Sequence, residues 1–279
     1  MACRVDGRAE TRISVLERAL QYGDGLFETL RVCDGRPQHL QRHLTRLQAG
    51  CERLRIGGVE RGPLVDEIRE LAAGVDTAVL KLIVGRGHGA RGYGIEGCGP
   101  PRRILCLHRW PQWPAERERG IRARICETRL SPQPLLAGIK HLNRLEQVLA
   151  RAEWSDPAIA EGLMLDRNGR LVEGTMSNVF LVHGDTLVTP RLDACGVAGV
   201  MRSVLLDCAS ALGITTEVRA VEARELREVD ELFVCNSLIG LWPVIELDGR
   251  SLPAGPLGAR LQSQLEDADN PVETNWYPE

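Results

Sequence analysis

The stretch Ala137-Gly138-Ile139-Lys140-His141-Leu142-Asn143-Arg144-Leu145-Glu146-Gln147 contains one of only two lysines in a chain of 279 residues, the other being Lys81. Arginine supplies nearly all of the positive charge, because lysine and arginine together number 35. An arginine stays protonated, whereas a lysine whose pKa is lowered in a pocket can form a Schiff base with a carbonyl group. Lys140 is therefore a candidate for covalent catalysis. Lys81 lies inside an apolar run, and for it we favour an ordinary surface lysine.

The bulk composition excludes several classes of protein. A formal charge of -3 and a pI near 6.1 leave no basic excess, so nucleic acid and anionic membrane are poor partners. No apolar run has the length needed to cross a bilayer, and the N-terminus lacks the apolar core of a signal peptide. The nine cysteines show no CxxC pair and no metal-ligand spacing. The sequence predicts a cytoplasmic protein without a metal site, whose cysteines serve as small hydrophobic residues.

The spacing of apolar residues predicts an N-terminal domain of helices and buried strands. Apolar residues at steps of four and three predict a helix at 38–55, and Pro63 suits the first turn of a second helix. Apolar runs at 78–84 and 104–107 predict strands. Prolines in Trp110-Pro111-Gln112-Trp113-Pro114 interrupt this pattern. We predict a smaller domain at 1–110 and a linker at 111–118.

A larger C-terminal domain, containing Lys140, is predicted at 119–279. Strands are expected at 121–128, around Leu163, Val179, Leu187, Ile214 and Leu232, and at 241–247, and helices at about 143–154, capped by Asn143, and 200–212. The chain after about Glu266 is acidic and predicts a loosely held tail. Because strands and helices do not alternate strictly, the fold class is mixed α+β.

The motif Gly87-x-Gly89-x-x-Gly92 imitates a dinucleotide-binding fingerprint. A dinucleotide fold would need a helix directly after it, but the sequence continues as a loop toward another strand. Arg86, Arg91 and Tyr93 on this loop are candidates for binding an anionic substrate. A solvated connecting loop is an equal alternative.

The stretch from Ala137 to Arg151 resembles the lysine segment of the fold-type-IV pyridoxal-phosphate enzymes, the branched-chain-aminotransferase-like family. The resemblance extends from about Val15 to Leu265 and predicts the two-domain fold of D-amino-acid aminotransferase. Further matching segments appear in the family's order along the chain: Tyr22 to Thr29, His43 to Leu47, Glu173 to Phe180, Gly196 to Arg202, and Asn236-Ser237 before Pro243-Val244.

The resemblance implies a role for particular residues of this chain. Lys140 would carry pyridoxal 5'-phosphate, Arg46 would bind the phosphate, and Glu173 would pair with the pyridine nitrogen. The other cofactor-binding residues implied are Asn178, Gly199, Val200 and Ser237. The candidates for substrate binding are Thr29, Arg86, Arg91, Tyr93 and Asn236. An arginine and a helix N-terminus suit a phosphate, and a carboxylate favours the protonated ring that accepts electrons.

The sequences around Lys140 and from Gly85 to Tyr93 are most similar to the corresponding segments of the aminodeoxychorismate lyases. This implies elimination of pyruvate from 4-amino-4-deoxychorismate to give 4-aminobenzoate, a folate precursor, by a homodimer. The fold alone does not select the chemistry, because branched-chain and D-amino-acid aminotransferases share it. A non-catalytic protein that binds pyridoxal phosphate is a third alternative, although it would not need Glu173.

Overall fold

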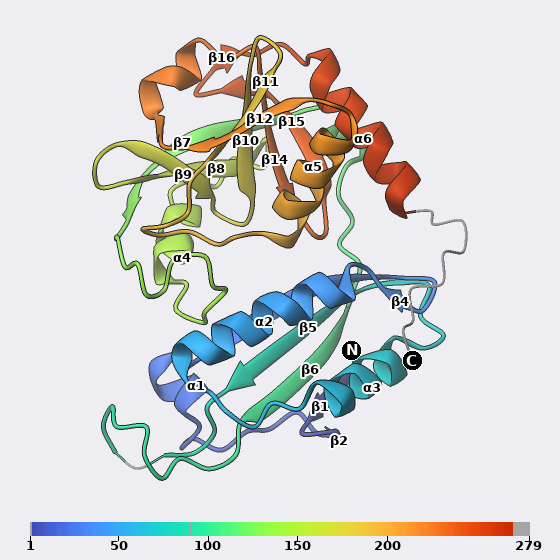
Figure 1. The fold of residues 1–279 in the computed structure, drawn as a ribbon, viewed down its shortest axis with the longest axis vertical. Helices are drawn as coiled ribbons and strands as arrows, with labels where there is room; N and C mark the ends of the chain where they lie inside the picture. The colour runs from blue at the N-terminus through green and yellow to red at the C-terminus, as the bar shows by residue number, and fades with distance from the viewer. Residues whose placement is uncertain (1, 90, 270–279) are drawn as a thin grey trace. The chain divides into compact units, whose positions relative to one another are not determined.

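The structure, a computed structural model, describes residues 2–89 and 91–269. The chain forms two compact units and passes between them several times. The first unit contains the residues up to 113 together with 130–149 and 192–200; the second contains 114–129, 150–191 and the residues from 201 onward. Each unit is built on its own β-sheet, which confirms the predicted mixed α+β class (Figure 1).

A six-stranded antiparallel sheet forms the first unit. Its strands, in spatial order, are β2 (Arg8–Ala9), β1 (Ala2–Val5), β6 (Arg102–Arg109), β5 (Thr77–Gly85), β3 (Gly25–Cys33) and β4 (Arg36–Pro37). The strands predicted at 78–84 and 104–107 lie within β5 and β6, which confirms both.

Two helices, α2 (Leu40–Leu54) and α3 (Arg61–Ala72), pack on one face of this sheet (Figure 1). Both were predicted. Their apolar stripes enter one core with alternate residues of the strands: Leu44, Leu47, Cys51, Leu64, Ile68, Leu71 and Ala72 from the helices, and Leu30, Leu80, Leu82 and Leu105 from the sheet. Since side chains alternate along a strand, the intervening residues Phe27, Thr29 and Lys81 lie on the opposite face of the sheet.

The lysine segment belongs to the first unit, although we predicted it in a C-terminal domain at 119–279. Ile139 is buried in the core beneath α2. Arg53, near the end of α2, donates from Nη1 to the carbonyl oxygen of Ala137 at 2.6 Å. The division therefore follows packing rather than chain order, and the chain first crosses between the units at Trp113 and Pro114.

The second unit is built on a mixed sheet, as the sequence predicted. In spatial order its strands are β12 (Thr215–Arg219), β11 (Thr186–Pro190), β10 (Asn178–His183), β14 (Glu231–Asn236), β15 (Gly240–Leu247), β7 (Ile121–Leu130), β8 (Ile159–Asp166), β9 (Arg170–Gly174) and β13 (Val221–Glu222), and β16 (Arg250–Ser251) pairs with β15. The pairs β11–β12 and β15–β7 are parallel. The predicted turns at 166–169 and 183–185 close the hairpins β8–β9 and β10–β11.

The remaining helices differ in part from the predictions. They are α1 (Arg18–Tyr22), α4 (Leu145–Arg151), α5 (Val200–Ala211), α6 (Pro256–Asp269) and the 3-10 helices η1 (Ala115–Glu118) and η2 (Ala223–Arg227). α5 agrees with the prediction, and α4 is shorter than predicted. α6 was missed, although Leu257, Leu261 and Leu265 recur every four residues and are buried. The predicted tail is helical as far as Asp269, and its remainder at 270–279 lies outside the described residues.

One cysteine pair corrects the sequence prediction. Cys3 on β1 and Cys106 on β6 form a disulfide, because antiparallel pairing places them directly opposite with 4.2 Å between their Cα atoms. Their separation of 103 residues gave no signal in the sequence. The cysteines that are buried and free do behave as small hydrophobic residues: Cys51, Cys126, Cys195, Cys208 and Cys235. None of the helices within 2–89 and 91–269 has the length and hydropathy of a membrane-spanning segment.

Candidate active site

Lys140 is fixed by the backbone on both sides. The amide of Phe27 donates to the carbonyl oxygen of Lys140 at 2.9 Å, and the amide of Leu142 donates to that of Gly25 at 3.0 Å. The lysine segment therefore extends the pairing of β3 at its N-terminal end, where Leu26 and His141 form an isolated bridge. Such an anchored backbone holds the side chain of Lys140 at a defined position on the unit.

The two lysines of the chain lie over the same aromatic ring. Nζ of Lys140 is 4.5 Å from the ring centroid of Phe27, and Nζ of Lys81 is 5.4 Å from it. Lys81 pairs with Thr29 across β3 and β5, and both side chains are half-buried. We predicted an ordinary surface lysine at this position, and the structure adds the contact of its half-buried side chain with the Phe27 ring. This contact follows from the register of β3 with β5, which the sequence alone does not give.

Arg46 connects α2 with the segment at 196–200. Its Nη1 donates to the carbonyl oxygen of Ala198 at 3.0 Å, and its Nε donates to Glu28 at 2.8 Å. Two backbone hydrogen bonds hold this segment against the lysine segment. The amide of Gly138 donates to the carbonyl oxygen of Gly196 at 2.9 Å, and the amide of Ala198 donates to that of Gly138 at 3.0 Å. Gly138 has a φ of 81°, a conformation that glycine adopts without strain.

The segment at 196–200 leads directly into a helix. Gly199 is the residue before α5, which begins at Val200. The first amides of a helix lack partners within the helix, and the helix dipole adds a partial positive charge there. Backbone and side-chain contacts in the first unit thus link Arg46 with Ala198, the residue before Gly199, and Ala198 with Gly138, two residues before Lys140.

In the second unit, two predicted residues flank the turn between β9 and β10. Glu173 on β9 and Asn178 on β10 are both buried. The turn between them is fastened by Glu161, which accepts from the amide and hydroxyl of Thr175 at 3.1 and 2.6 Å and from the hydroxyl of Ser177 at 2.6 Å. Sequence reasoning missed Glu161. Its one signal was a glutamate in the middle of an apolar strand, Ile159 to Leu165.

The predicted pair Asn236 and Ser237 lies where β14 ends. Oδ1 of Asn236 accepts from the amides of Leu238 and Ile239 at 2.9 and 3.0 Å, and its Nδ2 donates to the carbonyl oxygen of Met176 at 3.1 Å. Asn236 therefore shapes the β14–β15 turn and ties it to the β9–β10 turn. These bonds occupy the side chain, so the structure does not support Asn236 as a substrate-binding residue. Ser237 is half-buried beside it.

Arg86 has a structural role that corrects its assignment to the substrate. Its guanidinium donates to both carboxylate oxygens of Asp24 at 2.8 and 2.9 Å, and to the carbonyl oxygens of Leu54 and Arg55 at 2.7 and 2.8 Å. Only 8 % of the residue is exposed. Lysine and arginine side chains at the end of a helix commonly satisfy its last carbonyl groups. Arg86 thus satisfies the carbonyl groups at the C-terminal end of α2.

Between Arg86 and β6 the described residues, which exclude residue 90, form no helix of the kind that a dinucleotide-binding motif would need. Arg91 and Tyr93 on this loop are exposed. Arg18 holds the loop, because its Nη1 donates to the carbonyl oxygen of Gly92 at 2.9 Å. The ring of Tyr93 meets that of Tyr22 edge to face, with 5.4 Å between the centroids. Arg91 and Tyr93 stay predictions for substrate binding.

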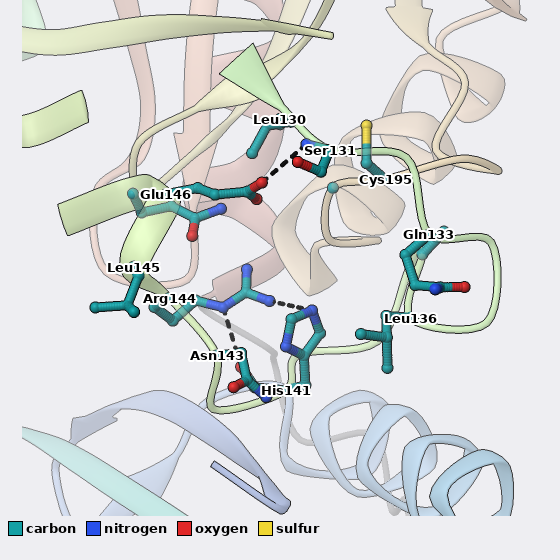
Figure 2. Close-up of a pocket in the computed structure, with 13 residues that line it drawn as sticks. Leu130, Ser131, Gln133, Leu136, His141, Asn143, Arg144, Leu145, Glu146 and Cys195 are labelled. Carbon is teal, nitrogen blue, oxygen red and sulfur yellow. Dashed lines mark hydrogen bonds between the residues drawn. The ribbon is translucent and has the colours of Figure 1, made fainter. Parts of the chain in front are cut away.

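A cavity of about 240 Å³ lies beside the lysine segment, and Figure 2 shows the side chains around it. Arg144 donates from Nε to the carbonyl oxygen of His141 at 3.0 Å, and Glu146 accepts from the amide of Ser131 at 2.9 Å. Burial and the charge of Arg144 lower the pKa of His141 to about 4, so this ring is neutral at pH 7. Lys140 is not among the lining residues, so we do not assign this cavity to the cofactor.

Asn143, another lining residue, does not cap α4 as predicted. Its Nδ2 donates to the carbonyl oxygen of Gly23 at 3.1 Å, and the helix begins only at Leu145. The side chain instead fastens the lysine segment to the loop before β3.

Comparison with known proteins identifies the family. A sequence model described as amino-transferase class IV matches residues 25–247. The chain belongs to the class IV aminotransferase family. It is 36% identical over 266 residues to an aminodeoxychorismate lyase of Vibrio harveyi, covering 94% of this chain and 98% of that protein. It is 26% identical over 275 residues to a D-alanine aminotransferase of Bacillus licheniformis, covering 95% and 94%.

A solved structure of 4-amino-4-deoxychorismate lyase from Pseudomonas aeruginosa is 52% identical and superposes with a TM-score of 0.92, covering 95% of this chain and 98% of that one. Membership of the class IV family confirms the predicted fold and the predicted class of pyridoxal-phosphate-dependent enzyme.

The predicted cofactor residues of this chain have the chemical groups that pyridoxal phosphate requires. Arg46 and the N-terminus of α5 suit a phosphate dianion, because both offer N–H donors and positive charge. Nζ of Lys140 is on the same unit and suits a covalent link to an aldehyde. The buried carboxylate of Glu173 suits a protonated ring nitrogen.

Proposed function

We propose that the chain is a pyridoxal-phosphate-dependent 4-amino-4-deoxychorismate lyase, which eliminates pyruvate and leaves 4-aminobenzoate. The observation that carries the proposal is the setting of Lys140, whose backbone is anchored to β3 and whose Nζ lies 4.5 Å from the ring centroid of Phe27. The lyase is favoured over an aminotransferase by identities of 52% and 36% to two lyases along nearly the whole chain, against 31% to a putative branched-chain-amino-acid aminotransferase of Methanocaldococcus jannaschii and 26% to the D-alanine aminotransferase.

The bound cofactor supplies an aldehyde that links to an amine and a pyridine ring that accepts electrons from the carbon bearing that amine. Lys140 would hold the cofactor through Nζ between turnovers. Once the substrate amine had taken its place, Nζ would act as the base that accepts the proton from the carbon bearing the nitrogen. Loss of that proton and of the neighbouring carbon–oxygen bond would leave an aromatic ring; the departing enolpyruvate takes up a proton and becomes pyruvate, and Nζ of Lys140 would replace the product amine and so release 4-aminobenzoate. Glu173 would favour the protonated ring nitrogen, and Arg46 with Gly199 and Val200 would hold the phosphate, assisted by Asn178 and Ser237.

Lys81 replaces Arg86 as a candidate for binding a substrate carboxylate. Its Nζ lies over the ring of Phe27, which Nζ of Lys140 also contacts, and Thr29 is its neighbour across the strand pair. An ammonium group at this position offers three donors to a carboxylate. Arg91 is a second candidate cation, so the two carboxylates of the substrate each have one.

We also propose that the enzyme is a cytoplasmic homodimer, whose second copy covers an apolar surface on the first unit. Leu145, Val148 and Leu149 are three and four residues apart on α4, so they share a face, and they are 76%, 60% and 61% exposed. Val15, Leu16 and Leu20 add further exposed apolar area. Surfaces of this kind mark interaction sites. Equilibrium sedimentation tests the dimer, and Val148→Glu should shift it toward the monomer.

A pyruvate assay on aminodeoxychorismate separates the functions. The lyase forms pyruvate without any oxo-acid acceptor. An aminotransferase needs an oxo acid to accept the amino group, and a non-catalytic binding protein gives no product with or without the oxo acid. Borohydride reduction should remove the absorbance band of the bound cofactor and leave its label on the Lys140 peptide. Glu173→Gln should retain the cofactor and lose activity by orders of magnitude. A label on Lys81, or pyruvate formation that depends on an oxo acid, would overturn the proposal.

A further inference from the structure

Glu28 is a buried carboxylate that the proposed chemistry does not use. It lies on β3 between Phe27 and Thr29, but its side chain points to the opposite face, toward α2, and it is 1% exposed. His43 and Arg46 are three residues apart on α2 and therefore share a face of the helix. Both reach this carboxylate.

Glu28 determines the orientation of the Arg46 guanidinium. Nε of Arg46 donates to Oε1 of Glu28 at 2.8 Å, and Nη2 donates to Oε2, so the planar group is held by two parallel hydrogen bonds. Nη1 donates to the carbonyl oxygen of Ala198 at 3.0 Å. A guanidinium has five N–H groups, so these contacts use three and leave one on each Nη.

His43 supports Glu28 from the other side. A carboxylate only accepts, so Nδ1 of His43 carries the proton and donates to Oε2 of Glu28 at 2.6 Å. Burial lowers the pKa of the ring, against the opposing effect of Glu28, so His43 is neutral. In the part of the chain that the structure describes, its Nε2 is buried and has no hydrogen-bond partner. The charges of Glu28 and Arg46 therefore balance without His43.

Resting on the function proposed above, we propose that Glu28, supported by His43, is a positioning residue that presents the two remaining N–H groups of Arg46 to the phosphate monoester of the cofactor. Without Glu28, the long side chain of Arg46 would keep its charge and lose the two bonds that fix its plane. The expected consequence is a weaker preference for phosphorylated over unphosphorylated cofactor.

The test compares the affinities of the apoenzyme for pyridoxal phosphate and for pyridoxal, which lacks the phosphate. Their ratio isolates the contribution of the phosphate, and a loss that is merely structural would weaken both ligands equally. In Glu28→Gln, we expect the ratio to fall about tenfold or more while pyridoxal affinity changes by less than about threefold. Equal losses for both ligands, or an unchanged ratio, would refute the proposal.

A matched control is Glu231→Gln. Glu231 is also a buried carboxylate, but it accepts from the amides of Leu257 and Gly258 at the start of α6. This variant should lose stability without a change in the ratio. If Glu28→Gln does not fold, His43→Leu decides, since it keeps the Glu28–Arg46 pair and removes one support. A smaller fall of the ratio in the same direction is expected, and no fall would refute the proposal.

A double-mutant cycle separates this inference from the proposed function. If Glu28 acts through Arg46, Glu28→Gln should not lower the ratio further in an Arg46→Ala background. A wild-type protein without phosphate preference, or Arg46→Ala with the wild-type ratio, would contradict the phosphate role of Arg46 and with it both proposals. If Arg46→Ala lowered the affinity ratio but Glu28→Gln left it unchanged, only the inference about Glu28 would be contradicted.

Discussion

Replacing Glu161 should destabilise the turn that separates Glu173 from Asn178. The Glu161 carboxylate is 1% exposed and accepts from Thr175, Ser177 and the amide of Gly162 at 2.6 to 3.1 Å. Each hydrogen bond to a charged group contributes about 1.5–3 kcal/mol, but these bonds share one carboxylate and are not additive. Glu161→Ala leaves several buried donors without an acceptor, so we expect a loss of about 3–5 kcal/mol in the free energy of unfolding. Glu161→Gln keeps the shape and one acceptor oxygen and should lose about 2 kcal/mol.

Urea denaturation followed by far-UV circular dichroism measures both losses. Ser177→Ala is the control, because it removes a single donor and should cost about 1 kcal/mol. A loss below about 1 kcal/mol in Glu161→Ala would show that solvent or other groups satisfy these donors, and the role given to Glu161 would be wrong.

Three further predictions follow from other parts of the structure. Arg86→Lys should lower stability by about 2 kcal/mol, through lost bonds to Asp24 and the end of α2, while pyridoxal-phosphate affinity stays unchanged; a rise in KM with unchanged stability would restore its role in substrate binding. The pKa of His141 falls from 6.5 in the unfolded chain to about 4 in the folded one, so only the unfolded state takes up a proton between these values; the contribution of His141 is complete above pH 6.5 and is lost as pH falls to about 4. Because the ring is partly exposed, solvent screening limits this loss to about 1–2 kcal/mol, and it should be absent from the pH dependence of urea stability in His141→Gln. Alkylation of the native protein should modify Cys33 and Cys98 first, since burial raises the pKa of Cys51 to about 11 and of Cys126 and Cys235 to about 12; mass spectrometry that found Cys235 modified first would contradict this.

Local patterns in the sequence were sufficient for most elements of the fold. α2 and α3 were predicted because their buried residues recur at the helical period, and β5 and β6 because short branched runs favour buried strands. Lys140 was singled out by composition alone, since lysine is so rare in this chain. The roles of Arg46, Glu173 and the segment at 196–200 came from a resemblance along the chain, since each of these residues by itself is ordinary.

The tertiary structure decided which residues meet, because long-range contacts leave no local pattern. Lys81 and Lys140 lie over one ring only because the register of β3 with β5 and the return of the lysine segment to β3 place them there. Arg86 looked like a free cation in the sequence, yet in the structure its donors are used by Asp24 and the last carbonyls of α2. Cys3 and Cys106 are joined through antiparallel pairing across 103 residues. The sequence by itself therefore predicted most of the elements and a candidate role for Lys140, whereas the register of β3 with β5 and the return of the lysine segment to β3 determined which side chains surround that lysine.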